Sequence, residues 1–264
     1  MTGHTPRKRF GQNFLVSQDI IARIVAAIAP RAGDTMVEIG PGLGALTAPL
    51  LERLGRLDVV EIDRDLIARL SRRFPPERLT IHEGDALKFD FAGLISGAGT
   101  DSAGLRVVGN LPYNISTPLL FHLAQYASRV RDMHFMLQRE VVLRMVAAPG
   151  GGEYGRLSVM LQYRFEMERL FDVPAAAFDP APKVDSAIVR MIPRPVAALA
   201  AADEALFARI VSAAFGQRRK MLRNTLRELV DAAQLAQLGI SPSARAEELG
   251  VADFVRIANA LIAS

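Results

Sequence analysis

The stretch Asp34-Thr35-Met36-Val37-Glu38-Ile39-Gly40-Pro41-Gly42-Leu43-Gly44 decides the fold of this 264-residue chain. Its first six residues are predicted to form a strand, the glycines a tight loop, and residues 45–54 a helix. Glycines between a strand and a helix let the backbone turn sharply and approach a ligand closely. The spacing is G-x-G-x-G, not the G-x-G-x-x-G of dinucleotide-binding folds, and Pro41 removes one N–H donor. The loop therefore favours a ligand without a pyrophosphate group.

Strand and helix patterns alternate after this loop, which predicts an α/β fold with a parallel, doubly wound sheet. Strands are expected at residues 57–62, 79–82, 106–109 and 133–137, and helices at 65–74 and 116–126. Residues 157–165 and 186–192 are then predicted to be strands, which would suit antiparallel edge positions. From residue 197 the pattern is helical throughout. We therefore predict a Rossmann-like catalytic domain at 1–195 and a small all-helical domain at 196–264.

Composition excludes several classes of function. The chain has no cysteine, which excludes disulfides, thiolate metal sites and the cysteine-dependent methylation of pyrimidine carbon 5. Its four histidines are scattered without ligand spacing, so no metal site is expected. The N-terminus is polar and basic and lacks the apolar core of a signal peptide, so a cytoplasmic protein is expected. A monomer is a separate expectation. Arginine supplies most of the positive charge, which suits phosphate contacts but also fits a bias in codon usage.

Three acidic residues lie where the predicted strands end. Glu38 precedes the first glycine and suits a ligand with an ammonium group. Glu61 ends the second strand, where a ribose-binding carboxylate is expected in such folds. Asp85 follows the third strand and could accept a hydrogen bond from an adenine amine. Together with the glycine loop they indicate S-adenosylmethionine as cofactor and S-adenosylhomocysteine as product. The alternative is that Glu61 and Asp85 are ordinary helix caps or surface acids.

The segment Gly109-Asn110-Leu111-Pro112-Tyr113-Asn114 follows the fourth predicted strand. An adenine amine is a poor nucleophile because its lone pair is delocalised into the ring. Two acceptors aimed at its hydrogens, the side-chain oxygen of Asn110 and the carbonyl of Leu111, would favour a tetrahedral nitrogen. Pro112 stiffens the loop, and Tyr113 offers a ring on which an extruded base can stack. The alternative is a turn in which these residues serve only local structure.

Taken together, these motifs resemble those of the ribosomal RNA adenine dimethyltransferases, and among them those of the bacterial small-subunit branch. The resemblance runs from about Arg7 to the C-terminus. It is carried by Arg9-Phe10-Gly11-Gln12-Asn13-Phe14-Leu15, the glycine loop, Asn110-Leu111-Pro112-Tyr113-Asn114-Ile115-Ser116, Phe178-Asp179-Pro180-Ala181-Pro182-Lys183-Val184-Asp185-Ser186 and Phe215-Gly216-Gln217-Arg218-Arg219-Lys220.

The resemblance implies that two neighbouring adenines, in a hairpin near the 3′ end of 16S rRNA, each receive two methyl groups. The partner would be small-subunit rRNA or the immature 30S subunit. The resemblance also implies which residues contact the cofactor: Asn13, Leu15, Gly40, Glu61, Asp85 and Asn110, in a loop that includes Gly42.

Phe178 is implied by the same resemblance to close over the base opposite Tyr113. Independently, it lies in a proline-rich loop too stiff for a linker, where an aromatic ring could sandwich a base. The alternative is a buried anchor for that loop. Two basic clusters could line an RNA backbone, although each also fits a solvated surface. One is Arg7, Lys8 and Arg9; the other is Arg218, Arg219, Lys220, Arg223 and Arg227, in which 219, 223 and 227 would share one face of a helix.

Other functions remain open from the sequence. Adenine methyltransferases of DNA and glutamine methyltransferases of proteins use a similar short loop, although Leu111 here replaces its first proline. Related enzymes act on large-subunit rRNA. A ribosome-assembly factor could use the fold for binding alone, against which the intact cofactor and catalytic motifs argue.

Overall fold

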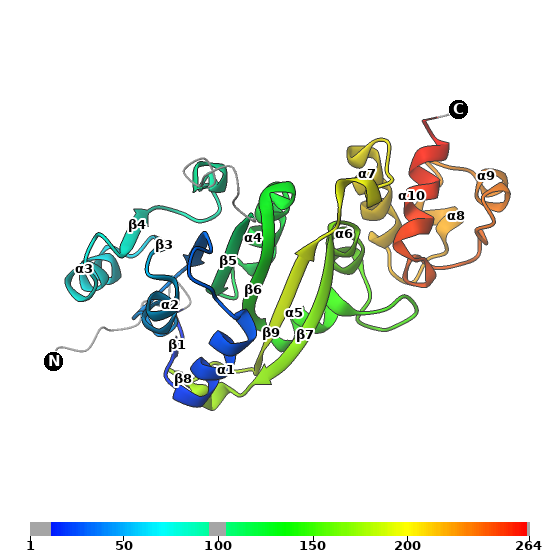
Figure 1. Ribbon diagram of the computed structural model, residues 1–264. Helices are drawn as coiled ribbons and strands as arrows, with labels where there is room; N and C mark the ends of the chain where they lie inside the picture. Colours follow the sequence, from blue (N-terminus) through cyan, green and yellow to red (C-terminus); the bar gives the residue numbers. More distant parts are fainter. Residues whose placement is uncertain (1–11, 95–103, 263–264) are drawn as a thin grey trace. The chain divides into compact units, whose positions relative to one another are not determined.

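The computed structural model describes residues 12–94 and 104–262 (Figure 1). The chain divides into two compact units. The sheet unit comprises residues 1–142 and 168–193, and the helical unit comprises residues 143–167 and 194–264. The predicted domains, 1–195 and 196–264, stay a prediction; the compact units differ in placing residues 143–167 with the C-terminal helices. None of the described helices is long and apolar enough to cross a bilayer.

A seven-stranded sheet, in the order β4-β3-β2-β5-β6-β9-β7, forms the centre of the described part of the sheet unit. The pairs from β4 through to β6 are parallel, whereas β9 is antiparallel to β6. This confirms the predicted parallel core and the antiparallel direction of the 186–192 strand. The expected edge position of that strand is wrong, because β7 lies beyond β9 in the sheet. The strands are β2 (Met36–Ile39), β3 (Leu57–Glu61), β4 (Leu79–Glu83), β5 (Leu105–Asn110), β6 (Val130–Gln138), β7 (Phe165–Val173) and β9 (Ser186–Pro193).

Helices connect the parallel strands, as a doubly wound fold requires. The α1 helix buries one apolar stripe, Ile20, Ile21, Ile24, Val25 and Ile28, in a cluster shared with α2 and the sheet. Asp63 begins α3 as its N-cap, because its carboxylate accepts the N–H of Asp65. The helices that follow strands are α1 (Gln18–Ile28), α2 (Thr47–Leu54), α3 (Arg64–Arg73), α4 (Ser116–Ala124) and α5 (Arg139–Val146).

A second, two-stranded sheet joins segments far apart in the sequence. Here β1 (Phe14–Leu15) pairs antiparallel with β8 (Phe178–Asp179), so that Leu15 lies opposite Phe178. The backbone N–H of Val16 continues this contact by donating to the carbonyl of Ala177 at 2.9 Å. The N-terminal segment is thereby held against the sheet unit. Neither short strand was predicted, because two residues carry no periodicity.

The helical unit has its own apolar core, with Phe207, Val211, Leu235 and Phe254 fully buried. Asp203 caps α7 by accepting the N–H groups of two residues in its first turn. The elements are α6 (Arg156–Arg164), α7 (Glu204–Phe215), α8 (Leu222–Thr225), α9 (Ala232–Gln237) and α10 (Val251–Ala260). Single 3-10 turns occur at Phe91–Leu94, Ala127–Arg129, Ala175–Ala177, Val196–Ala198 and Ala246–Glu248.

The strand predicted at residues 157–165 is wrong, because this segment is the helix α6. Apolar residues occupy every second position of this segment, and that period-2 pattern is typical of a half-buried strand. Packing against α7 and α10 decides the outcome. The Ser158 hydroxyl, which accepts the N–H of Gly155 and donates to the carbonyl of Arg144, fixes the start of the helix. The edge strand β7, which begins where this helix ends, was missed.

Candidate active site

The carboxyl ends of the central strands surround a cavity of about 250 Å³ in the sheet unit. The glycine loop follows β2, Glu61 ends β3, Asp85 follows β4, and Asn110 ends β5. Parallel strands present these ends at one edge of the sheet, which is where ligands bind in open α/β folds. The cavity is lined by residues 12–15, 38–43, 45–46, 60–62, 66, 84–87 and 110–115.

The glycine loop adopts a backbone that other residues rarely adopt. Gly40 and Gly42 have φ values of 65° and 60°. A Cβ on Gly42 would lie 3.3 Å from the ring of Phe14, so the N-terminal segment packs directly against the loop. A side chain at position 42 would therefore meet both strain and a close contact. The loop and residues 12–15 form adjacent parts of one cavity wall.

Glu61 is a buried carboxylate held in place by backbone donors. Its side chain is 6 % exposed, and its Oε1 accepts the N–H groups of Ile62 and Asp63, each at 2.9 Å. Its Oε2 accepts the N–H of Gly42 at 3.4 Å. Burial raises the pKa of Glu61, although these three N–H groups act in the opposite direction. The suggestion that Glu61 is a helix cap is wrong, since Asp63 caps α3.

Asp85 lines the same cavity from the loop after β4. Its Oδ1 accepts the N–H of Leu87 at 3.0 Å, which closes a local turn. The carboxylate therefore has a structural role in its own loop in addition to its position at the cavity.

Glu38 lies deepest among the acidic residues. It is 2 % exposed, and the hydroxyl of Thr47 donates to its Oε2 at 2.6 Å. Burial raises the pKa of Glu38 from 4.5 to about 7; the Thr47 hydroxyl opposes this, and the nearby Glu61 adds to it. The ionised form is thus the costly one in the folded protein.

This raised pKa predicts a pH-dependent loss of stability. Below pH 4.5 Glu38 is protonated in both the folded and unfolded states, and the stability lost as it ionises is lost between pH 4.5 and about 7. The two values correspond to roughly 3 kcal/mol. We expect Glu38→Gln to raise the free energy of unfolding by about that amount at pH 8 and very little at pH 4.5, measured by urea denaturation without added cofactor.

Glu52→Gln, which changes an exposed carboxylate on α2, is the matched control and should show no such difference. An equal effect of Glu38→Gln at both pH values would contradict the prediction.

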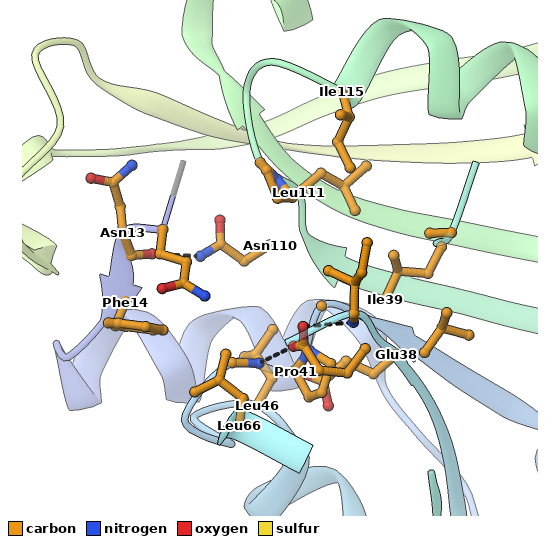
Figure 2. A pocket seen from close by; sticks show the side chains of 18 of the residues that line it. Asn13, Phe14, Glu38, Ile39, Pro41, Leu46, Leu66, Asn110, Leu111 and Ile115 are labelled. Carbon is orange, nitrogen blue, oxygen red and sulfur yellow. Dashed lines mark hydrogen bonds between the residues drawn. The ribbon is translucent and has the colours of Figure 1, made fainter. Parts of the chain in front are cut away.

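Asn110 lines the cavity. Its Nδ2 donates to the backbone carbonyl of Asn13 at 3.1 Å, so the amide nitrogen is engaged and Oδ1 remains as acceptor. Figure 2 shows this bond between the labelled side chain of Asn110 and the backbone of Asn13. The next residue, Leu111, donates its N–H to Met136, while its carbonyl accepts no hydrogen bond from the described residues. Asn110 Oδ1 and the Leu111 carbonyl are therefore acceptors on two adjacent residues of the cavity wall, and their role in catalysis stays a prediction.

Tyr113 lines the cavity beyond Pro112. Its hydroxyl forms a 2.7 Å hydrogen bond with the hydroxyl of Ser186, and its carbonyl accepts the Ser116 hydroxyl at 3.1 Å. The loop that bears it is therefore fixed at several points.

Comparison with known proteins identifies the family of this chain. Residues 3–263 match the model of a family described as "Ribosomal RNA adenine dimethylase". The chain belongs to the ribosomal RNA adenine dimethylase family. It is accordingly an S-adenosylmethionine-dependent methyltransferase.

Relatives support this membership. The chain is 68 % identical to "Ribosomal RNA small subunit methyltransferase A" of Aromatoleum aromaticum, over 100 % of this chain and 97 % of that protein. A dimethyladenosine transferase from Plasmodium falciparum has a similar structure, with a TM-score of 0.78, 25 % identity and coverage of 92 % of this chain and 95 % of its own. The 23S rRNA methyltransferase ErmE gives a TM-score of 0.68 at 25 % identity, covering 95 % of this chain and 100 % of its own.

Phe178, which was expected to close over the target base, is not among the residues that line this cavity, and that role stays a prediction. It is 5 % exposed and packs in the apolar core of the sheet unit. Its position matches the alternative of a buried anchor, since Phe178 lies opposite Leu15 in the β1–β8 pair and both belong to the same apolar cluster. The other predicted cofactor and catalytic residues all line the cavity: Asn13, Leu15, Gly40, Gly42, Glu61, Asp85, Asn110, Leu111, Pro112 and Tyr113.

The basic cluster of the dimethylase lies on the helical unit, and the expectation that it forms one helical face is wrong. The α8 helix covers only Leu222–Thr225, so Arg219 and Arg227 lie in the turns on either side. The backbone pairing of Met221 with Arg245 interrupts a longer helix. All five basic residues, Arg218, Arg219, Lys220, Arg223 and Arg227, are nevertheless exposed.

Two residues of this basic cluster form ion pairs with glutamates. Arg218 is paired with Glu247 at 3.2 Å and donates to the carbonyl of Gly152. Arg227 lies 3.8 Å from Glu228. Arg7, Lys8 and Arg9 lie outside the described residues.

Sequence reasoning missed several residues of the cavity, among them Gln12, Phe14 and Ile62. Gln12 donates to Asp63 at 3.0 Å and so joins the N-terminal segment to the start of α3. Ile62 is a large apolar side chain exposed at the cavity. Its place directly after Glu61 was the available signal, since the strand pattern ends there. Among the described residues no group of histidine and acidic side chains is arranged to hold a metal ion.

Proposed function

We propose that this chain dimethylates the exocyclic amines of two adjacent adenines in a hairpin near the 3′ end of 16S rRNA, with S-adenosylmethionine as methyl donor, and acts in small-subunit biogenesis. The observation that carries the proposal is the pair of acceptors, Asn110 Oδ1 and the Leu111 carbonyl, at the cavity that Glu61 and Asp85 line. The small-subunit substrate is supported by the name of the 68 % identical relative.

The cavity fits the proposed cofactor. Glu61 is a fixed, buried acceptor suited to the two hydroxyls of a ribose, and Asp85 has a second oxygen for an adenine amine. The exposed side chain of Ile62 offers an apolar surface beside them. Glu38 lies near the glycine loop, where the amino-acid part of the cofactor would lie, and an ammonium group there would favour its ionised form. Gly40 and Gly42 let the backbone approach it closely.

The residues of the catalytic loop prepare the adenine for attack. The cofactor supplies an electrophilic methyl group on a sulfonium. Asn110 Oδ1 and the Leu111 carbonyl each accept one hydrogen of the target amine, which favours a tetrahedral nitrogen with its lone pair free. The ring of Tyr113 stacks on the extruded base. The methylated nitrogen is acidic and loses its proton to water, so no strong base is required.

The proposed partner is structured small-subunit rRNA, free or in an immature 30S particle, which implies a cytoplasmic protein. Arg219, Lys220 and Arg223 of the helical unit are exposed and would contact RNA phosphates. Arg218 and Arg227 would do so once a phosphate replaces the neighbouring glutamate as their partner. Arg7, Lys8 and Arg9 are proposed as a second contact. Recognition would depend on RNA shape and an unpaired base, because an RNA major groove is too narrow to be read. We propose that a monomer acts.

The second candidate is methylation of large-subunit rRNA. The ErmE structure favours it, with 25 % identity and a TM-score of 0.68. The small-subunit relative at 68 % identity is far more similar, and we therefore rank this candidate second.

Incorporation of labelled methyl groups into small-subunit rRNA, large-subunit rRNA, duplex DNA and protein tests the proposal. We expect dimethyladenosine in small-subunit rRNA only, located by mass spectrometry, and its loss from the rRNA of cells without this protein. Incorporation should fall steeply with added salt, and less steeply for Arg219→Ala with Lys220→Ala. Methylation of another substrate in preference to small-subunit rRNA would overturn the proposal.

A further inference from the structure

Ser186 is a fully buried hydroxyl beside the catalytic loop, with a relative exposure of 0 %. It begins β9 and lies opposite Gln138, the last residue of β6. Since β6 pairs with β5, which ends at Asn110, this hydroxyl sits at the same end of the sheet as the catalytic loop. A hydroxyl buried to this extent is normally hydrogen-bonded.

The partner is the hydroxyl of Tyr113, at 2.7 Å. The ring of Tyr113 is thus held at both ends. Its backbone is fixed by the Ser116 hydroxyl, and the far end of its side chain is fixed by Ser186. A ring held at both ends cannot swing about its χ1 bond, so its plane is set before any base arrives.

The backbone around Ser186 is itself anchored. The adjacent Asp185 accepts the N–H of Ala175 through its carboxylate at 2.9 Å, and its carbonyl accepts the N–H of Arg139 at 3.0 Å. Burial also raises the pKa of the Tyr113 hydroxyl, because the ionised form is the costlier one in this site.

We propose that Ser186 is a positioning residue for the reaction, acting through the Tyr113 hydroxyl to hold the ring in the plane on which the target adenine stacks. The inference rests on the proposed function, because it assigns Tyr113 the role of base platform. The rate contribution comes from preorganisation of the ring, since an immobile platform orders the base without further loss of freedom.

A double-mutant cycle on Ser186→Ala and Tyr113→Phe tests this inference. Both single variants keep the ring and remove the same hydrogen bond. We expect each to lower kcat for methylation of unmethylated 30S particles about tenfold, with the cofactor Kd unchanged in calorimetry. The double variant should be no slower than either single one, because the second change has nothing left to remove.

Ser158→Ala is the matched control, since it removes another fully buried serine hydroxyl, in the helical unit. We expect it to lower the melting temperature without lowering kcat. Multiplicative effects in the double variant, or an equal drop in kcat for Ser158→Ala, would overturn the inference.

Failure of the proposed function has a different signature. In that case the unaltered protein would not methylate adenine in 30S particles, or Tyr113→Ala would be as fast as the unaltered protein. If both of those results are as expected and only the cycle is additive, the role of Ser186 alone is refuted.

Discussion

Replacing Asn110 with alanine is expected to lower the rate of adenine methylation about a thousandfold, the magnitude found for losing one precisely placed polar group at a reacting centre. The variant loses the acceptor that, with the Leu111 carbonyl, draws the target amine toward tetrahedral geometry. It also loses the donor to the Asn13 carbonyl, which orients the amide. The measurement is single-turnover methylation of unmethylated 30S particles.

Binding to those particles should remain largely intact in Asn110→Ala, because the exposed basic residues of the helical unit are unchanged. Filter binding at matched salt concentrations measures this. Gln125→Ala, which removes an exposed amide at the end of α4, is the control and should be as fast as the unaltered protein. Equal loss of methylation and particle binding would refute the separation of the two roles.

Asn110→Asp sharpens the test. Aspartate keeps the acceptor but has no N–H for the carbonyl of Asn13, which lies 3.1 Å from Nδ2 in the structure. A carboxylate oxygen facing that carbonyl is repelled, so the side chain should turn away. We expect the activity of this variant to be well below that of the unaltered protein. If Asn110→Asp methylates as fast as the unaltered protein, the contact with Asn13 does not orient the side chain of residue 110.

The second large effect is expected for Glu61→Ala, which should weaken binding of S-adenosylmethionine about a hundredfold in titration calorimetry. A carboxylate that accepts two ribose hydroxyls forms charge-assisted hydrogen bonds, each worth about 1.5–3 kcal/mol. Because backbone N–H groups hold this carboxylate in place, little order is lost when the ligand binds. Circular dichroism should show the fold preserved.

Two further variants make the Glu61 result specific. Glu61→Gln keeps the volume and one oxygen, and is expected to bind with intermediate affinity. Glu83→Ala removes an exposed carboxylate at the end of the adjacent strand β4 and should leave the affinity unchanged. Unchanged affinity in Glu61→Ala would show that the ribose assignment is wrong.

Local sequence patterns were sufficient to predict the parallel strands at the centre of the sheet. The glycine loop, the acid at the end of β3 and the Asn-Leu-Pro-Tyr segment after β5 each follow a short buried strand. Parallel strands bring their carboxyl ends to one edge of a sheet, so their order along the chain already predicted one shared site. The residues that line the cavity confirm that they meet.

Patterns failed where long-range packing competes with local preference. The segment of α6 has the apolar content of a strand, yet it is a helix because α7 and α10 cover it. The basic cluster has helical spacing, yet the pairing of Met221 with Arg245 limits α8 to Leu222–Thr225. Neither partner is visible in the local stretch of residues.

The sequence alone thus predicted the chemical groups of the site and their order along the chain. This was possible because strand ends and glycine turns are encoded within a few positions. The orientation of those groups came only from contacts between distant segments: Asn13 with Asn110, Ser186 with Tyr113, and the strand pair that buries Phe178. Such contacts join residues tens of positions apart. They depend on how the sheet brings segments together, and this is a property of the folded chain that no single stretch contains.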